Sequence, residues 1–285
     1  MAFRTAGLAA IAVLFLAPSF QAFAQPDPAA NAGFDAYVHA VEGRLDQQHR
    51  HTKDHAQEGF LAPVTAPQAE TRLRNGEFLI EKLTPDPAPG LPGALLFDWR
   101  GTAFVQGAKA ADFEHVLRDF NAYPKYFAPQ VLQASIVSQN GDRMQARMRV
   151  RQHHVITVVL DTNYDITFGR PAPGRGYNIS RSTQISEIES AGTPSERALP
   201  PDKAHGFMWR LNTYWSWVQR DGGLYLQIES ISLSRSIPPA LGWALRPFVE
   251  SIPRESLDFT LRSAASALRG KPVAPDASDT TVPKS

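Results

Sequence analysis

The 285-residue chain contains no cysteine. Disulfides, thiolate nucleophiles and cysteine-ligated zinc or iron–sulfur sites are therefore excluded. The chain also lacks a charge surplus, with 29 lysines and arginines against 28 aspartates and glutamates. A nucleic-acid-binding protein needs basic residues to neutralise phosphates, so the charge balance argues against that class. Because 43% of the residues are hydrophobic, a highly charged disordered chain is excluded as well.

Long apolar runs are also absent, since no segment reaches the roughly 18 residues that a membrane span needs. The nearest is the run of 12 from Ala6 to Ala17, which follows the single charge of Arg4 and is broken by Pro18. Ala22-Phe23-Ala24 then places small residues where a signal peptidase reads them. We therefore expect residues 1–24 to be a cleaved signal peptide, with an uncleaved membrane anchor as the alternative. The mature protein is expected to be periplasmic or secreted, without stable membrane insertion.

Residues 25–93 are predicted to form an N-terminal extension with one amphipathic helix. The apolar residues at helical spacing are Phe34, Tyr37, Val38, Val41 and Leu45. Four prolines within residues 84–93 indicate a linker before the main domain. Residues 270–285 are rich in small polar residues and proline, and we expect a disordered tail there.

Residues 94–269 carry a regular succession of strand and helix patterns. A first strand, Leu95–Gln106, precedes a helix over Ala110–Phe120 and a short helical turn over Tyr123–Phe127. Six strands are expected next: Val131–Gln139, Asp142–Arg151, Ile156–Phe168, Tyr177–Ile188, His205–Gln219 and Gly223–Arg235. Ser251 can cap a final helix whose apolar side carries Leu257, Leu261 and Leu268.

This β-α-α-β6-α order resembles that of the START-like, polyketide cyclase (helix-grip, SRPBCC-type) superfamily. The segment Asp119-Phe120-Asn121-Ala122-Tyr123-Pro124 is similar to the entry motif of its bacterial members. The resemblance implies an α+β, helix-grip fold over residues 94–269. In that fold a curved antiparallel sheet surrounds a long C-terminal helix and encloses a hydrophobic cavity. The superfamily contains binding proteins and enzymes alike, so the fold does not decide the activity.

The cavity wall is expected to consist of strand residues and of helix residues that face them. This predicted ligand-binding set is Met144, Met148, Tyr164, Ile179, Arg181, Trp209, Trp215, Glu229, Leu257 and Leu261. Methionine and tryptophan give an adaptable lining for flexible or planar apolar ligands. The alternative is that these side chains fill the core completely.

Arg181 lies in phase with apolar neighbours, and a buried arginine needs a partner. Glu229 on a later strand is one possible partner, either as a ligand anchor or as a structural ion pair. Around Glu229 the apolar positions change parity between Ile228 and Ile231, which predicts a β-bulge.

Histidines cluster at His49, His51 and His55, and such spacing is used by zinc sites. Arg50 and Lys53 lie among them and would repel a metal ion, so we interpret the segment as solvated surface. No phosphate-binding glycine loop or Ser-His-Asp signature is present. No metal, cofactor or catalytic residue is assigned, and the oligomeric state is left open.

Three functional hypotheses follow. The leading one is an exported binding protein for a lipid-like or polycyclic hydrophobic small molecule. The alternative is an enzyme of cyclase, hydratase or hydrolase type, with Arg181, Glu229, His205 and Tyr214 as candidate polar groups. A third is an interaction module, in which the helix of residues 34–45 packs on the exposed face of the sheet or on a partner.

Overall fold

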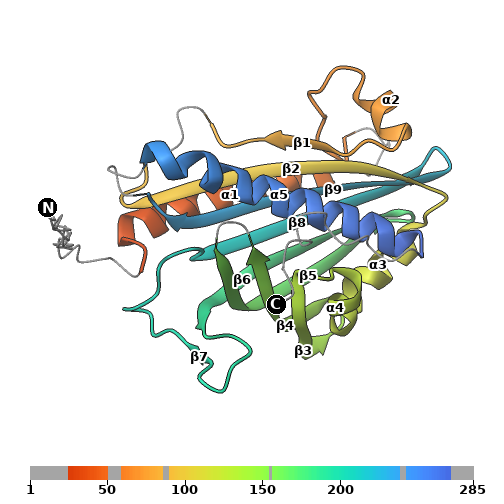
Figure 1. Cartoon of the computed structure of the whole chain (residues 1–285). Helices are drawn as coiled ribbons and strands as arrows, with labels where there is room; N and C mark the ends of the chain where they lie inside the picture. Colours follow the sequence, from red (N-terminus) through yellow and green to blue (C-terminus); the bar gives the residue numbers. More distant parts are fainter. Residues whose placement is uncertain (1–24, 51–58, 86–89, 154–155, 238–241, 271–285) are drawn as a thin grey trace, which may run out of the picture.

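The computed structural model describes residues 25–50, 59–85, 90–153, 156–237 and 242–270 (Figure 1). The helices are α1 (Pro28–Arg50), α2 (Ala69–Arg74), α3 (Ala110–Arg118), the 3₁₀ helix η2 (Phe120–Ala122), α4 (Tyr123–Tyr126) and α5 (Gly242–Leu268). The strands are β1 (Leu79–Lys82), β2 (Ala94–Gln106), β3 (Val131–Asn140), β4 (Arg143–His153), β5 (Thr157–Ala172), β6 (Arg175–Glu189), β7 (Arg197–Ala198), β8 (Arg210–Arg220) and β9 (Gly223–Arg235). The predicted signal peptide, His51, His55 and residues 271–285 lie outside the described part of the chain.

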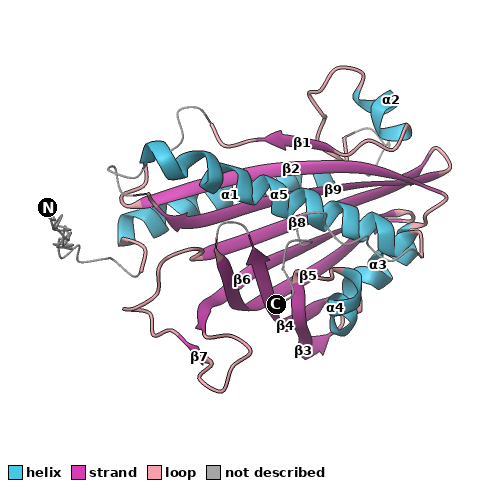
Figure 2. Cartoon of the chain, in the orientation of Figure 1, coloured by secondary structure: helices cyan, strands magenta, loops and turns pink. Residues whose placement is uncertain are grey.

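The strands form one antiparallel sheet in the order β1-β2-β9-β8-β6-β5-β4-β3, with β7 paired to β6. Figure 2 shows this sheet curving around α5, which runs along one of its faces. From β2 onward the element order is strand, helices, six long strands and a final helix, interrupted only by the two-residue β7. The predicted α+β, helix-grip fold is therefore confirmed.

The face of the sheet that α5 covers is called the inner face below. Along α5, Leu257, Leu261, Ala264 and Ala265 are buried against it, together with Phe113 of α3. Gly101 of β2 permits this close approach, because a Cβ atom there would lie 3.1 Å from Cδ2 of Leu261. The second half of α5 thus contributes directly to the hydrophobic core.

The opposite, outer face is covered in part by α1. The predicted apolar stripe of this helix is buried through Phe34, Val38, Val41 and Leu45. These side chains pack on a set of sheet residues comprising Ala94, Leu96, Tyr214, Ile231 and Leu233. The hypothesis that the N-terminal helix packs on the exposed sheet face therefore agrees with the structure. The extension also adds β1, which pairs with β2.

The predicted bulge near Glu229 is wrong. β9 pairs with β2 in one continuous register from Gly223 to Arg235, and its register with β8 is continuous as well. The apolar residues of β9 switch from even to odd positions because both faces of this strand are covered. Ile228 is buried on the inner face, whereas Ile231 is buried on the outer face beneath α1.

Among the described residues, no helix has both the length and the apolar character needed to cross a membrane.

Candidate functional site

The centre of the inner face carries small hydroxyl side chains. Residues directly opposite each other on neighbouring strands share a face of the sheet. One row across the sheet pairs Trp99 with Ser230, Ser230 with Thr213, Thr213 with Ser180, and Ser180 with Ile166. Trp99 and Ile166 both belong to the core cluster beneath α5, which places the whole row on the inner face.

A second row lies one step closer to the end of the sheet where α5 begins. Here Phe97 pairs with Ser232, and Ser232 pairs with Leu211. Ser182 lies next to Leu211, because its Oγ accepts a hydrogen bond of 2.9 Å from the Leu211 amide. The hydroxyl patch is defined as Ser180, Ser182, Thr213, Ser230 and Ser232. It spans the central strands β6, β8 and β9 and is bordered by aromatic and aliphatic side chains on β2 and β5.

The hydroxyl patch contrasts with the row on its other side. There Ile228, Trp215, Asn178 and Phe168 follow one another across the sheet. Phe113 of α3 packs edge-on against Trp215, with ring centroids 5.1 Å apart. The inner face is therefore densely packed by large side chains near α3. Toward the start of α5 it changes to small polar ones.

Several polar groups on this part of the inner face lack protein partners. No hydrogen bond joins the side chains of Ser180, Thr213, Ser230 or Asn178 to another described residue. The Trp99 indole nitrogen and the Ser234 hydroxyl are fully buried and also have no partner. Buried polar groups are satisfied in the great majority of cases, so the Trp99 indole and the Ser234 hydroxyl need an external partner such as a ligand or water. Thr213 and Ser230 are only partly buried, so their hydroxyls are open to solvent or to a ligand.

The structure divides the predicted cavity wall between the two faces of the sheet. The six residues that belong to the core between the sheet and α5 are Met144, Met148, Tyr164, Trp215, Leu257 and Leu261, and the other four do not face this interior. Ile179 and Trp209 instead pack with the cluster beneath α1. Arg181 and Glu229 also lie on the outer face, because both contact α1.

The expected pairing of Arg181 with Glu229 is replaced by two separate ion pairs. Nε of Arg181 donates to Oε1 of Glu42 over 2.6 Å, and Nη2 of Arg44 donates to Oε1 of Glu229 over 2.5 Å. The physical reason is the cover provided by α1. Because α1 covers the outer face of β6, the apolar positions of this strand, such as Ile179, face α1. The small polar positions, such as Ser180, face α5.

The polar groups of the enzyme hypothesis do not converge on the inner face. Tyr214 donates a hydrogen bond of 3.0 Å to Glu42, the carboxylate that also binds Arg181, on the outer face. His205 lies elsewhere, with Nδ1 2.8 Å from Oε2 of Glu187, whose carboxylate also accepts the backbone amides of the following loop. The structure thus joins Arg181 with Tyr214 and leaves His205 apart from them.

A buried acidic cluster beneath α1 was not predicted. Asp98, on β2, is 1% exposed and accepts a hydrogen bond of 2.8 Å from the Tyr37 hydroxyl, while its Oδ1 has no partner. Burial and then repulsion by Glu229 raise the pKa of Asp98 to about 7, although Arg44 and Arg100 oppose the shift. Its position between Phe97 and Trp99 in an apolar strand was the available sequence signal.

Replacing Asp98 by asparagine is expected to change how stability depends on pH. An aspartate in an unfolded chain has a pKa of about 3.9. The folded protein therefore holds this proton more tightly and loses stability as the pH rises from about 4 to about 7. Asp98→Asn should have similar stability to the parent at pH 4.5 and be about 1–3 kcal/mol more stable at pH 8. Urea titrations at both pH values measure this difference. Asp35→Asn, an exposed change on α1, is the control, and a pH-independent effect of Asp98→Asn would contradict the assignment.

His49 is buried, so the interpretation of its segment as solvated surface is wrong for this residue. Its ring stacks on Tyr177 with centroids 4.3 Å apart, and Nε2 lies 3.0 Å from the Ser216 hydroxyl. Burial, followed by the charge of Arg44, lowers the pKa of His49 to about 4. It is therefore neutral at pH 7. The described residues contain no group of three or more side chains placed to hold a metal ion.

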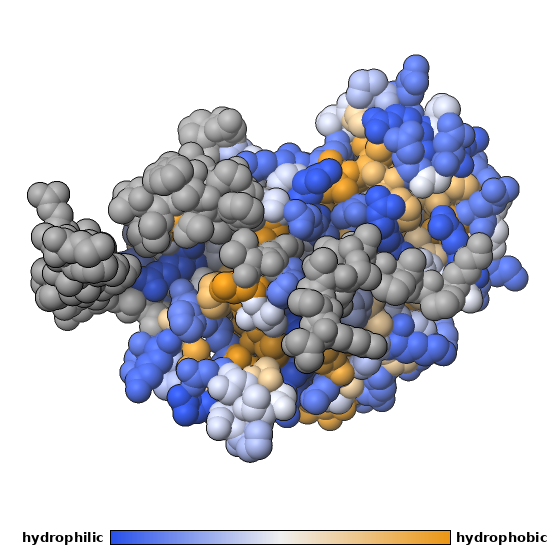
Figure 3. All heavy atoms as spheres, viewed as in Figure 1, coloured by the Kyte–Doolittle hydropathy of each residue, from blue (hydrophilic) through white to orange (hydrophobic). Residues whose placement is uncertain are grey.

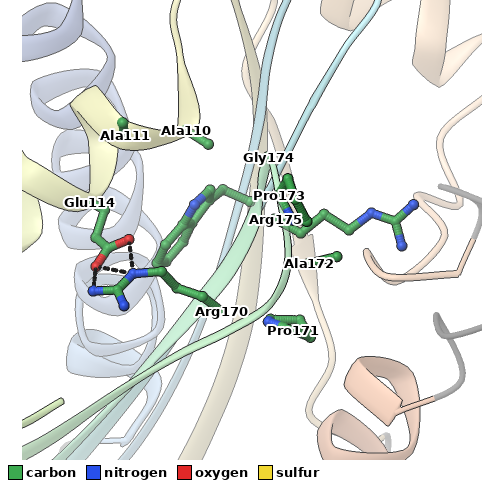
Figure 4. Close-up of a pocket in the computed structure, with 10 residues that line it drawn as sticks. Ala110, Ala111, Glu114, Arg170, Pro171, Ala172, Pro173, Gly174 and Arg175 are labelled. Atoms are coloured by element: carbon green, nitrogen blue, oxygen red, sulfur yellow. Dashed lines mark hydrogen bonds and ion pairs between the residues drawn. The ribbon is translucent and has the colours of Figure 1, made fainter.

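Two shallow hollows lie at the hairpin between β5 and β6. One, of about 410 Å³, is shown in Figure 4 between this hairpin and the start of α3, with Glu114 accepting hydrogen bonds from Arg170 at its side. The other lies between the same hairpin and α1, beside His49 and Tyr177. Both are open to the surface, with the buried Trp217 in the wall of the first and the buried His49 in the wall of the second. On the face shown in Figure 3, hydrophobic side chains also reach the surface in the lower central part of the view.

No protein-family model and no curated protein matches the chain. Among solved structures, it is similar to a STAR-related lipid transfer protein from Xanthomonas axonopodis, with 21% identity, 64% of this chain and 97% of that chain covered, and a TM-score of 0.41. It is also similar to the Zhui aromatase/cyclase from Streptomyces sp. R1128, with 14% identity, 61% and 94% covered, and a TM-score of 0.42. A START superfamily protein from Mycobacterium smegmatis has 14% identity, 62% and 97% covered, and a TM-score of 0.38. Each likeness concerns the fold alone.

Proposed function

We propose that the protein binds a small hydrophobic molecule between the inner face of its sheet and α5. The observation that carries this proposal is the hydroxyl patch at the centre of an otherwise apolar inner face. Protein interiors are packed as densely as organic crystals, and a structural core at this position would be filled by large side chains. Serine and threonine fill less volume than such side chains, and the hydroxyls of Ser180, Thr213 and Ser230 are free to bind a hydrogen-bonding occupant.

The surroundings of the hydroxyl patch favour a ligand over a cluster of waters. Phe97 and Trp99 border it on β2, and Tyr164 and Ile166 border it on β5. A ligand that buries several hundred Å² of apolar surface against such walls gains on the order of 10 kcal/mol before association costs, at ~25 cal/mol per Å².

The direct test is native mass spectrometry of gently purified mature protein, followed by organic extraction. We expect a mass excess from a co-purified organic molecule that disappears on extraction. The extracted protein should then take up Nile red, a neutral apolar dye whose emission rises in an apolar site. A protein that carries no ligand and does not bind the dye would contradict the proposal.

A variant that fills the patch should block binding. Ser180→Leu places a large side chain at the centre of the inner face, and we expect Nile red to bind at least ten-fold more weakly, which corresponds to about 1.4 kcal/mol. Ser186→Leu is the matched control on the same strand, because Ser186 pairs with Asp161 on the outer face. Equal dye affinity of the two variants, with both folded by circular dichroism, would place the binding site elsewhere.

We further propose that the protein acts after export. The support is the sequence of residues 1–24, with Arg4, one apolar run and small residues at Ala22 and Ala24. The intact mass of the exported protein is expected to correspond to a chain that begins at Gln25. A mass that includes residues 1–24 would instead support an uncleaved membrane anchor.

A further inference from the structure

We infer that the ligand is a neutral, oxygen-bearing hydrophobic molecule, held through hydroxyl or carbonyl groups at the hydroxyl patch, rather than a carboxylate, a phosphate or an amine. This inference rests on the proposed function and gives its ligand a chemical class. It follows from three properties of the inner face. These are the lack of charge around the hydroxyl patch, the spacing of the hydroxyls and the identity of the unpartnered donors.

Around the hydroxyl patch, the inner faces of the four central strands carry no charged side chain among the described residues. The inward positions of β2 run from Leu95 to Val105, and those of β9 run from Leu224 to Ser234. On β8 they are Leu211, Thr213, Trp215 and Trp217, and on β6, as far as its bulge, they are Gly176, Asn178, Ser180 and Ser182. Beyond the bulge, Glu187 pairs with Leu160 and faces inward, and its carboxylate already accepts the backbone amides of His205, Gly206 and Phe207. A charged ligand group placed on this surface would be desolvated without an ionic partner, which is strongly unfavourable.

The charged residues next to Ser180 and Ser230 form their ion pairs on the other side of the sheet. Glu229 is paired with Arg44, and Arg181 is paired with Glu42, both across the outer face. Successive residues of a strand point to opposite faces, so neither side chain reaches the inner face without inverting its strand. The ligand therefore meets hydroxyls, an amide and aromatic rings.

The hydroxyls of the first row are spaced for a rigid molecule with oxygen substituents. Ser180, Thr213 and Ser230 lie side by side on three adjacent strands, which are about 4.8 Å apart. Each hydroxyl both donates and accepts a hydrogen bond, so it suits a ligand hydroxyl or carbonyl equally. At the end of the row the indole N–H of Trp99 is buried and unpartnered, and it can only donate. The ligand must therefore present an acceptor oxygen at that end.

A matched series of naphthalene derivatives tests the inference, with Nile red displacement at pH 7.5 as the readout. We expect 2-naphthol and 2-acetonaphthone to displace the dye at concentrations at least ten-fold lower than 2-naphthoate and 2-naphthylmethylammonium. The ring system is the same in all four, so the ranking isolates the polar group. Tighter or equal binding of 2-naphthoate or of the amine would overturn the neutral-ligand inference while leaving the proposed binding function intact.

A variant that removes the hydroxyls but keeps their volume tests the patch itself. In Ser180→Ala/Thr213→Val/Ser230→Ala, the affinity for 2-naphthol should fall at least ten-fold, whereas the affinity for naphthalene should stay within about two-fold. Ser138→Ala, on the exposed surface of β3, is the control. An unchanged preference for 2-naphthol over naphthalene in the triple variant would overturn the role of the patch. If the parent protein binds neither Nile red nor any member of the series, the proposed function itself fails.

Discussion

Replacing Leu261 by alanine is expected to lower the free energy of unfolding by about 2–5 kcal/mol. Leu261 is completely buried at the point where α5 comes closest to β2. Gly101 lies directly beneath it and has no side chain with which to fill the space that the truncation leaves. Because the surrounding sheet is held by continuous hydrogen-bonded strands, the cavity cannot collapse readily, and we expect the upper part of this range.

Denaturant titration of the purified protein measures this loss. Leu132→Ala is the matched control, because Leu132 is 37% exposed on β3 and its truncation should cost less than about 1 kcal/mol. A loss below about 1 kcal/mol for Leu261→Ala would mean that α5 is peripheral to the fold. It would also weaken the proposed ligand site, since α5 forms its second wall.

The helix-grip fold could be predicted because local patterns determine most of it. Strands with one buried face show alternation, and the amphipathic stripe of α5 predicted that Leu257 and Leu261 would be buried. Met144, Met148 and Tyr164 were placed on the correct face for the same reason. Within the described residues, helices cover β4 and β5 on the inner side, so the apolar positions of these two strands identify that side.

The central strands were harder to assign, because α1 covers the other face of β6, β8 and β9. Ile179 is apolar as a result of contact with α1, and its alternation was indistinguishable from that of a residue facing α5. The same ambiguity concealed the hydroxyl patch, since Ser180 and Ser182 have the polar character usual for solvent-exposed positions. The alternation of apolar and polar residues separates the two faces of a strand, but it does not predict which helix covers which face.

The position of α1 therefore governs how the remaining polar residues are interpreted. His49 and Asp98 are buried only because the N-terminal helix lies across the sheet. The apolar neighbours of Asp98 and the position of His49 four residues after Leu45 are the local signals for their burial. Their partners could not be predicted, because contacts such as the hydrogen bond from Tyr37 to Asp98 join residues 61 positions apart in the chain. Local patterns do not identify the two partners of a long-range pairing of this kind.

Removing the guanidinium of Arg44 is expected to destabilise the protein by about 3 kcal/mol. The side chain of Glu229 is only 3% exposed, and its one ion pair is with Nη2 of Arg44 at 2.5 Å. Arg44→Met keeps most of the aliphatic packing but leaves a buried carboxylate without its counter-charge, beside Asp98. Since the Arg44 side chain is itself 39% exposed, the loss should fall at the low end of the range for broken buried pairs.

Two further variants separate the charge effect from packing. Arg210→Met removes another ion pair to α1, between Arg210 and Asp35, whose carboxylate is 60% exposed, and should cost less than about 1 kcal/mol. The double variant Arg44→Met/Glu229→Gln removes both charges and should recover most of the stability that Arg44→Met loses. Urea titration at pH 8 compares the four proteins. If the double variant were as unstable as Arg44→Met, the loss would come from packing of α1, and the buried ion pair would have no role in holding the helix on the sheet.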